Sequence, residues 1–145
     1  EAKRFIEQYF KRYPAVRDFV EETKTRARKE EVVHTLLGRR RPVGEINSRN
    51  AVERARAERI AVNTIIQGSA ADIMKQAMIR VDRMMRERRL LSALILQIHD
   101  ELVFEVPLDE VEEMKALVKE AMEGAVTLSI PLNVSISVGS NWGEL

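Results

Sequence analysis

The 145-residue sequence contains no cysteine, only four prolines and six glycines, and no long apolar run. The absence of cysteine excludes a disulfide framework, a thiolate zinc site and a cysteine nucleophile. So few prolines and glycines exclude a collagen-like or low-complexity chain. The most apolar stretch, residues 90–98, is too short to span a bilayer, and residues 1–4 do not resemble a signal peptide. We therefore expect a soluble protein of the cytoplasm.

The charge of the chain is unevenly distributed, although its net value is only +1. Residues 1–60 contain sixteen Lys and Arg against ten Asp and Glu, whereas residues 61–145 contain eight against thirteen. A basic half suggests a polyanionic partner and an acidic half suggests cation binding. Charged side chains that simply face water explain the same asymmetry. With 45% apolar residues, the chain has enough hydrophobic material for one domain of ordinary size.

The first half of the chain has mainly helical spacing. Residues 1–29 predict a helix that is interrupted and restarted at Pro14, and the β-branched run 32–37 predicts a short strand. Residues 38–50 predict a loop that contains three consecutive arginines. Residues 51–85 predict one long helix, with a possible bend or close backbone approach at Gly68. Its expected buried face consists of Ile66, Ala70, Ile73, Ala77, Val81 and Met84.

The second half predicts an α+β arrangement. Two apolar runs, residues 93–98 and 102–106, flank a polar turn and predict a β-hairpin. Asp109 and Glu112 have the spacing of a capping box, which would start a helix ending near Gly124. Alternating apolar and polar residues from 132 to 138 predict a final strand. We expect an antiparallel sheet, made of the hairpin and this strand, packed against long helices and preceded by a mainly helical segment.

The hairpin turn contains the consecutive polar residues His99, Asp100 and Glu101. Carboxylate oxygens are the protein ligands that Mg²⁺ prefers, and one or two carboxylates with phosphate oxygens usually suffice. The turn could therefore present a carboxylate to a divalent cation. Hairpin turns also favour Asp because they face water, and this simpler explanation is favoured by the pattern alone.

A polar stripe follows the first half of the long helix, at Arg56, Arg59, Asn63 and Gln67. Every side chain in it can donate a hydrogen bond, and none is acidic. In the minor groove of DNA, each base pair presents an acceptor at nearly the same place, so donors on one helix face could test pair geometry without recognising sequence. A solvated helix surface is an equally good explanation of the stripe.

The predicted loop contains Arg39, Arg40 and Arg41 in succession. Three adjacent arginines suit contacts with phosphate groups, which would make binding steeply dependent on salt. A solvated basic loop explains the run as well. The three polar features together favour a nucleic-acid partner, but the residues alone do not require it.

Several longer motifs resemble family A DNA polymerases, the bacterial DNA polymerase I group. Residues 97–107, QIHDELVFEVP, resemble the carboxylate-bearing palm hairpin of that family, and residues 57–75 resemble the long palm helix before it. Residues 35–41, TLLGRRR, resemble a segment further upstream. Residues 131–132 and 139–142 resemble the C-terminal ending of the family. The likeness is collinear over essentially the whole chain.

The resemblance assigns roles to the matching residues. Asp100 corresponds to a palm aspartate that binds two catalytic Mg²⁺ ions, and Glu101 is the adjacent carboxylate. His99 corresponds to a residue near the primer terminus. The family's contacts with the template–primer in the minor groove correspond to Arg59, Asn63 and Gln67, and the phosphate contacts suggested above would come from Arg39, Arg40 and Arg41.

The resemblance also implies that the chain is one part of a polymerase. Residues 1–50 would form a fingers–palm junction and residues 51–145 the C-terminal part of the palm. The family's second catalytic aspartate and its nucleotide-binding fingers helix have no counterpart in this sequence, so the isolated chain is expected to be inactive. The expected partners are a DNA template–primer, a dNTP and the remainder of the polymerase, with no membrane.

Two other functions remain open at the level of the sequence. The chain could be a catalytically silent nucleic-acid-binding module that retains a palm-like shape. It could also be a nuclease that uses one metal ion held by Asp100, Glu101 and His99. The presence or absence of a companion segment with the missing aspartate would distinguish a polymerase from a binding module.

Overall fold

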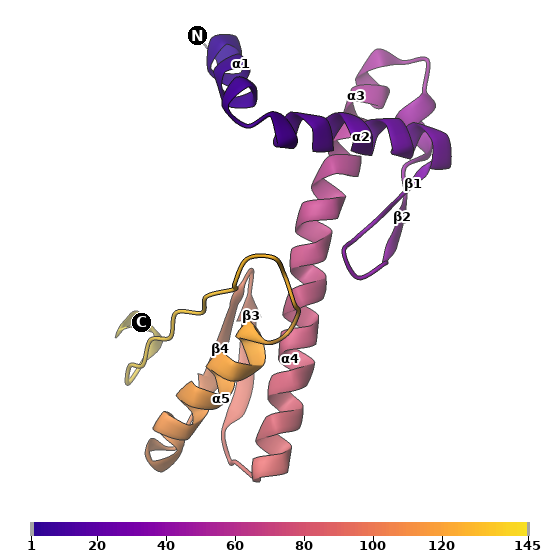
Figure 1. Cartoon of the computed structure of the whole chain (residues 1–145). Helices are drawn as coiled ribbons and strands as arrows, with labels where there is room; N and C mark the ends of the chain where they lie inside the picture. Colours follow the sequence, from indigo (N-terminus) through magenta and orange to yellow (C-terminus); the bar gives the residue numbers. More distant parts are fainter. Residues whose placement is uncertain (1, 145) are drawn as a thin grey trace. The chain divides into compact units, whose positions relative to one another are not determined.

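The chain folds into two compact units, the first ending at Ser69 and the second beginning at Ala70. The computed structural model describes residues 2–144, shown in Figure 1 with colours that follow the sequence. None of the helices in this range is long and apolar enough to cross a membrane. Each unit has its own hydrophobic core, and the two are described in turn.

The first unit is mainly helical, as the sequence predicts. Its elements in chain order are α1 (Ala2–Arg12), α2 (Pro14–Glu30), β1 (Val32–His34), β2 (Arg40–Pro42), a 3₁₀ turn (Gly44–Asn47), α3 (Ala51–Asn63) and a π-helical turn (Thr64–Gly68). Pro14 occupies the first turn of α2, where its missing N–H costs no helical hydrogen bond. The predicted restart of the helix at Pro14 is therefore confirmed.

The core of the first unit forms where α2, β1 and α3 meet. Small alanines on both helices allow close approach, and larger aliphatic side chains fill the space between them. The fully buried set consists of Ala27, Val33, Val43, Ile46, Ala57 and Ala61. At the end of α2, Glu31 adopts a left-handed backbone (φ 53°) and its N–H donates to the Ala27 carbonyl, which turns the chain into β1.

Arg40 and Arg41 lie in strand β2, so the prediction of a loop is wrong for them, whereas Arg39 precedes the strand. β2 pairs antiparallel with β1, with Arg41 opposite Val33 and Arg40 opposite His34. The predicted strand 32–37 is correspondingly shorter, because the chain turns at Gly38, whose φ of 84° is in the region that favours glycine. Arginine has no strong strand preference, so only the pairing with β1 makes this segment extended.

The predicted long helix is divided by the π-helical turn Thr64–Gly68, which we call the π-turn. The helix continues as α4 (Ser69–Arg88). A π-helical turn, with i→i+5 hydrogen bonds, contains one more residue than an α-helical turn. The residues after it are therefore rotated about the helix axis relative to the residues before it. Ala77, Val81 and Met84 are buried as expected, whereas the expected core residues Ile66 and Ala70 are exposed.

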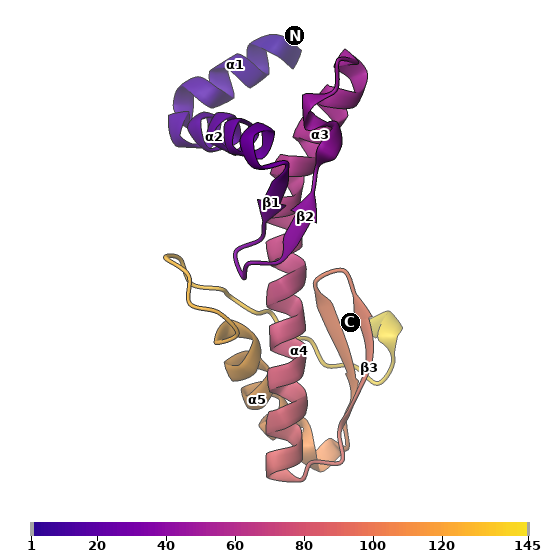
Figure 2. The ribbon, with the colours of Figure 1, turned by 90° about the vertical axis from the view of Figure 1, so that its right-hand side faces the viewer.

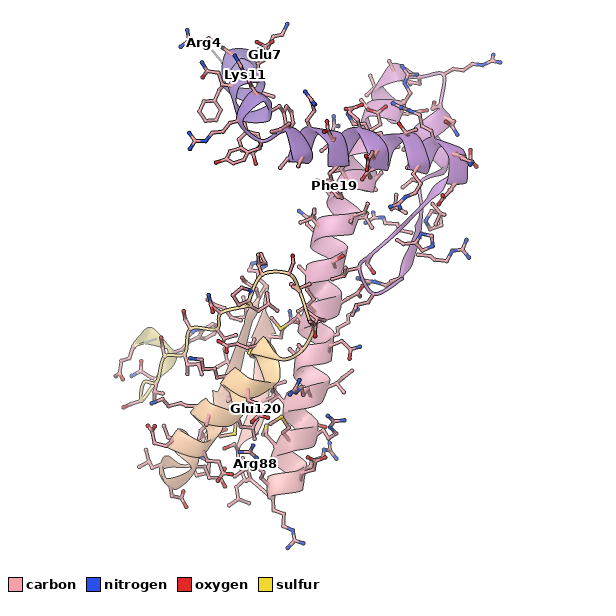
Figure 3. All side chains as sticks on the ribbon, viewed as in Figure 1. Arg4, Glu7, Lys11, Phe19, Arg88 and Glu120 are labelled. Atoms are coloured by element: carbon pink, nitrogen blue, oxygen red, sulfur yellow. The ribbon has the colours of Figure 1, made fainter. Side chains whose placement is uncertain are left out.

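The second unit contains α4, β3 (Ala93–Ile98), β4 (Glu101–Glu105), a 3₁₀ turn (Leu108–Glu110) and α5 (Val111–Glu123). Its core joins α4 to α5, through Val81, Met84, Met85, Met114, Leu117, Val118 and Ala121. Phe104 of β4 packs against this cluster, and Figure 2 shows α5 beside α4 from a second direction. At the edge, Arg88 and Glu120 form an exposed ion pair of 3.5 Å (Figure 3).

The hairpin prediction is confirmed in type and position. β3 and β4 pair antiparallel, from Ala93 opposite Glu105 to Ile98 opposite Glu101, with a bulge between Leu94 and Leu96. The α+β class is confirmed as well. The sheets of the described residues are two-stranded, one in each unit.

Two local predictions for the second unit are wrong. Residues 132–138 form no strand. Their alternation of apolar and polar residues would give a strand one buried face, but a strand also needs a neighbouring strand with free hydrogen-bonding groups. The N–H of Val134 donates instead to the Glu123 carboxylate, at 3.1 Å. Asp109 does not cap α5, since it lies within the 3₁₀ turn and α5 begins two residues later. The helix ends before Gly124, as predicted.

Glu110 ties the start of α5 to the start of the hairpin. Its carboxylate accepts hydrogen bonds from the N–H of Leu91 (2.8 Å), the N–H of Ser92 (2.9 Å) and the Ser92 hydroxyl (2.6 Å). These donors, led by the Leu91 N–H, favour the charged form and lower the pKa of Glu110 below its ordinary value. The ionised carboxylate therefore stabilises the connection between α4 and β3.

We expect the Glu110→Gln variant to be less stable than the parent chain at pH 7. Because the folded-state pKa of Glu110 is lowered, its stabilisation is complete above the ordinary glutamate pKa, about 4.3, and is lost as the pH falls through the folded-state value. The difference between parent and variant in urea unfolding should therefore shrink between pH 7 and pH 3.5. Glu105→Gln, which changes an exposed carboxylate in the same unit, is the matched control. An equal difference at both pH values would contradict the role of the charge.

Candidate nucleic-acid interface and carboxylate turn

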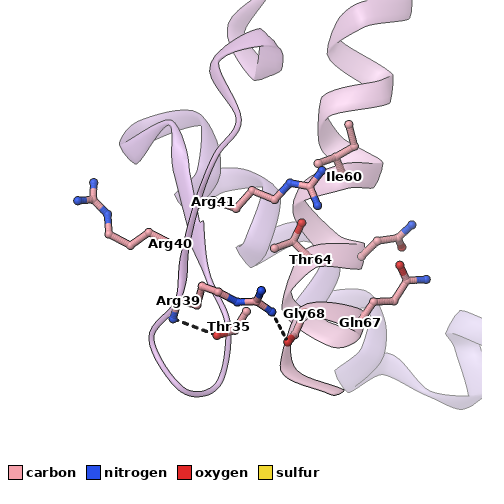
Figure 4. A pocket seen from close by; sticks show the side chains of 9 residues that line it. Thr35, Arg39, Arg40, Arg41, Ile60, Thr64, Gln67 and Gly68 are labelled. Carbon is pink, nitrogen blue, oxygen red and sulfur yellow. Dashed lines mark hydrogen bonds between the residues drawn. The ribbon is translucent and has the colours of Figure 1, made fainter. Parts of the chain in front are cut away.

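A polar pocket of about 360 Å³ opens in the first unit between the β1–β2 hairpin and the helix. It is lined by Thr35, Arg39, Arg40, Arg41, Ile60, Asn63, Thr64, Gln67 and Gly68. Figure 4 shows that these side chains come from opposite walls, one from the hairpin and one from α3 and the π-turn. The pocket therefore combines two motifs that are separated in sequence, the arginine run and the donor stripe.

The three arginines differ in what they contact. The Arg39 guanidinium donates to the carbonyl oxygen of Gly68 in the π-turn, at 3.0 Å. Arg41 extends toward Ile60, whereas Arg40 points away from the helix (Figure 4). Successive side chains of an extended segment point to opposite faces, so Arg39 and Arg41 point to the helix side and Arg40 does not. All three residues are exposed, so each remains accessible to solvent.

The donor stripe is exposed along its whole length. Asn63 and Gln67 line the pocket, and Arg59 lies with Asn63 in a second depression of about 320 Å³ that also contains Glu58. Glu58 is ion-paired with Arg28 at 2.6 Å, so the acidic group that lines this depression is balanced by another cation. The surface therefore presents hydrogen-bond donors and positive charge, the combination expected at a phosphate- and base-contacting surface.

The hydroxyl of Thr64 is buried and forms no hydrogen bond with any residue in the range 2–144. Buried polar atoms are normally paired, because leaving one unpaired costs about 1–3 kcal/mol. Thr64 is also the first residue of the π-turn, where the backbone departs from α-helical hydrogen bonding. The unpaired hydroxyl is therefore a cost that other contacts of the fold must offset.

The carboxylate turn lies in the second unit, at the end of the β3–β4 hairpin. His99 and Asp100 form the two-residue turn, and Glu101 is the first residue of β4. The backbone of His99 is left-handed, with φ of 51°, and its carbonyl accepts a hydrogen bond from the Gln97 amide at 2.8 Å. A two-residue hairpin turn requires such a left-handed residue, and histidine adopts this backbone more readily than most residues other than glycine.

The residue types of Asp100 and Glu101 suit part of a metal site. Both side chains are exposed and carry the hard oxygen atoms that Mg²⁺ prefers. Within residues 2–144, no three His, Asp or Glu side chains are close enough to hold a metal ion. The pair fits a magnesium ion that takes its remaining ligands from water, phosphate or another protein segment, and it does not fit a site built wholly from this chain.

Sequence reasoning did not identify Thr35, Ile60, Thr64 and Gly68 as lining residues. Helical spacing from Asn63 and Gln67 could have indicated Ile60 and Thr64, since residues three and four apart share a face. No local signal links Thr35 to Gly68, because their contact depends on how the hairpin packs against the helix. A Cβ on Gly68 would lie 2.8 Å from the Thr35 methyl carbon, so glycine is needed for this close approach. A close approach does occur at Gly68, but the Thr35 side chain makes it, and not another backbone as the sequence predicted.

Comparison with known proteins identifies the family. The sequence profile described as DNA polymerase family A matches residues 1–144. The chain is 48% identical over 144 residues to DNA polymerase I of Lactococcus lactis subsp. cremoris, covering 99% of this chain and 16% of the relative. It is also 46% identical over 145 residues to DNA polymerase I of Borreliella burgdorferi, covering all of this chain and again 16% of the relative.

A solved structure gives the same assignment. The POL domain of Pol1 from M. smegmatis, in complex with DNA primer-template and dNTP, matches with a TM-score of 0.91 and 49% sequence identity. The match covers 93% of this chain and 24% of that one. The sequence and the fold agree over nearly the whole chain, and we conclude that it belongs to DNA polymerase family A.

Proposed function

We propose that this chain is the C-terminal fingers–palm segment of a template-directed DNA polymerase. The complete enzyme would add deoxynucleotides to a primer 3′-hydroxyl, in the bacterial cytoplasm at the nucleoid. The observation that carries the proposal is the match over 93% of the chain to a polymerase domain in complex with DNA primer-template and dNTP. Residues 1–50 would then belong to the fingers–palm junction and residues 51–145 to the palm.

The donor surface of the first unit would contact the template–primer. Asn63, Gln67 and Arg59 are exposed and can donate to the minor-groove acceptors that every base pair presents. Arg40 and Arg41 can contact the phosphate backbone from the hairpin. Contacts of this kind hold DNA in place without recognising its sequence, as a template-directed enzyme requires. His99 would lie near the primer terminus.

Asp100 and Glu101 would hold two Mg²⁺ ions together with a carboxylate from outside this chain. Bound there, the ions stabilise charge on the phosphoryl oxygens and activate the attacking hydroxyl. The two carboxylates are exposed at a turn, so their oxygens can reach ions that also contact a triphosphate. Because phosphoryl transfer depends on positioning and charge stabilisation, half of this site should support little reaction. The isolated chain is therefore proposed to be inactive.

A catalytically silent nucleic-acid-binding module is the second candidate. It is favoured by the incomplete metal site within residues 2–144. A second carboxylate and a nucleotide-binding helix in the remainder of the protein or in a companion chain would support the polymerase, and their absence would support the binding module. Metal-dependent nicking of DNA by the isolated chain would instead support a one-metal nuclease, and we expect none.

We expect Asp100→Ala in the complete polymerase to reduce primer extension by about 10³-fold, because it removes several kcal/mol of metal-mediated stabilisation. DNA affinity should be largely retained, and Glu101→Ala should have a smaller effect. Single-turnover nucleotide incorporation and DNA binding, measured on the same variants, test the two statements. Asp109→Ala removes an exposed carboxylate of the same unit and should behave as the parent. Near-normal incorporation by Asp100→Ala would show that the assignment is wrong.

We expect Gln67→Ala in the complete polymerase to weaken template–primer binding by about fivefold, the equivalent of one hydrogen bond of about 1 kcal/mol. The loss should be the same for duplexes rich in A·T and in G·C, since both present minor-groove acceptors. Fluorescence anisotropy with both duplexes provides the measurement. Gln76→Ala, on the exposed surface of α4, is the matched control. A loss confined to one duplex would contradict minor-groove recognition of pair geometry.

A further inference from the structure

The tip of the β1–β2 hairpin is bonded to the π-turn and the residue after it. The Arg39 guanidinium donates to the Gly68 carbonyl at 3.0 Å, and the Leu36 N–H donates to the Ser69 hydroxyl oxygen at 2.7 Å. The Thr35 side chain lies against Gly68, where it leaves no space for a Cβ. These contacts, which we call the clamp, join residues more than 28 positions apart in the sequence.

The clamp itself is held by short-range hydrogen bonds in the hairpin. The N–H of Arg39 donates to the Thr35 hydroxyl at 3.0 Å, and the N–H of Thr35 donates to the Arg39 carbonyl at the same distance. Gly38 closes the turn by donating to the Thr35 carbonyl. The backbone of Arg39 is therefore fixed before its side chain reaches the helix, which lowers the entropy cost of the long side chain.

On the helix side, the clamp contacts the π-turn, where the regular backbone hydrogen bonds of the α-helix are interrupted. The Ser69 hydroxyl donates to the Ile65 carbonyl while it accepts from Leu36, so one side chain bridges the π-turn and the hairpin. A π-turn is less favourable than α-helix and persists where outside contacts support it. The Arg39 guanidinium and the Ser69 hydroxyl are such contacts.

The π-turn sets the relative directions of the two central donors. Asn63 is the last residue of α3, and Gln67 lies within the π-turn, directly before the carbonyl-bonded Gly68. Residues four apart share a face in an α-helix as well, so the π-turn decides how Gln67 is placed on that face relative to Asn63, and not whether the two share it. Because the Arg39 guanidinium bonds to the carbonyl directly after Gln67, it fixes the backbone from which the Gln67 side chain projects.

We propose that Arg39 and Ser69 are positioning residues, which hold the π-turn and thereby fix the placement of Gln67 beside Asn63 for contact with the DNA groove. The inference rests on the proposed function of Gln67 as a DNA contact. The inference gives Arg39 a role that Arg40 does not share, because Arg40 carries the same charge but points away from the helix (Figure 4). Arg39 therefore acts through the helix, and not chiefly as one more positive charge for phosphate.

The test compares Arg39→Gln and Arg40→Gln in the complete polymerase, each alone and combined with Gln67→Ala. Both arginine variants remove one positive charge, so both should reduce the slope of log affinity against log salt by about one or less. In the parent, Arg39→Gln should weaken template–primer binding by about fivefold more than Arg40→Gln does. In the Gln67→Ala background this excess should disappear, because the donor being positioned is already absent.

Ser69→Ala tests the clamp without a change of charge. We expect it to weaken DNA binding by about fivefold and to lose this effect in the Gln67→Ala background, whereas Ser69→Thr, which keeps the hydroxyl, should restore binding. Ser135→Ala, at an exposed position of the other unit, should behave as the parent. Hydrogen exchange of residues 64–69 should become faster in Arg39→Gln and Ser69→Ala but not in Arg40→Gln.

The outcomes separate failure of the inference from failure of the proposed function. If Gln67→Ala leaves DNA binding unchanged, both the DNA contact and the positioning role built on it are wrong. If Gln67→Ala weakens binding but Arg39→Gln matches Arg40→Gln and adds to Gln67→Ala, the contact stands and the positioning role is overturned. Unchanged hydrogen exchange in Ser69→Ala would also overturn the positioning role, whatever the binding data.

Discussion

The hydrogen bond from the Arg39 guanidinium to the Gly68 carbonyl connects the two walls of the pocket that contains Asn63 and Gln67. It joins a two-stranded hairpin to the one turn where the long helical segment departs from α geometry. The first compact unit ends directly after that turn, at Ser69. A local irregularity of the helix thus coincides with the pocket, with the close approach at Gly68 and with the boundary between units.

The contacts of the charged residues explain part of the uneven charge distribution of the sequence. The arginine run lines a pocket with neutral donors, and Glu58, which lines the depression beside Arg59 and Asn63, is paired with Arg28. In the acidic half, Glu110 holds the backbone at Leu91 and Ser92. Asp100 and Glu101 are exposed at a turn with a left-handed His99. In the acidic half, Glu110 thus maintains the fold, whereas Asp100 and Glu101 are accessible to a ligand.

Sequence reasoning was most successful where the determining interactions are local. The restart of the helix at Pro14, the end of α5 before Gly124 and the β3–β4 hairpin follow from backbone preference and spacing, and the structure contains all three. The prediction of a strand at 132–138 was wrong, because a strand needs a partner to pair with and an alternating pattern of apolar and polar residues does not provide one. The predicted core positions Ile66 and Ala70 are exposed, because helical spacing predicts a face but not where along the helix a neighbour packs, and the two core clusters contain residues up to Ala61 and from Val81 onward.

The sequence by itself determined the family, the carboxylate turn at His99, Asp100 and Glu101, and the donor character of Asn63 and Gln67, since each is a property of residue type and order. Only the tertiary structure decided that Arg39 bonds to the helix while Arg40 points away from it. It also decided that Gly68 is required for the approach of Thr35. Both results depend on contacts between segments about thirty residues apart, which local backbone preferences do not encode.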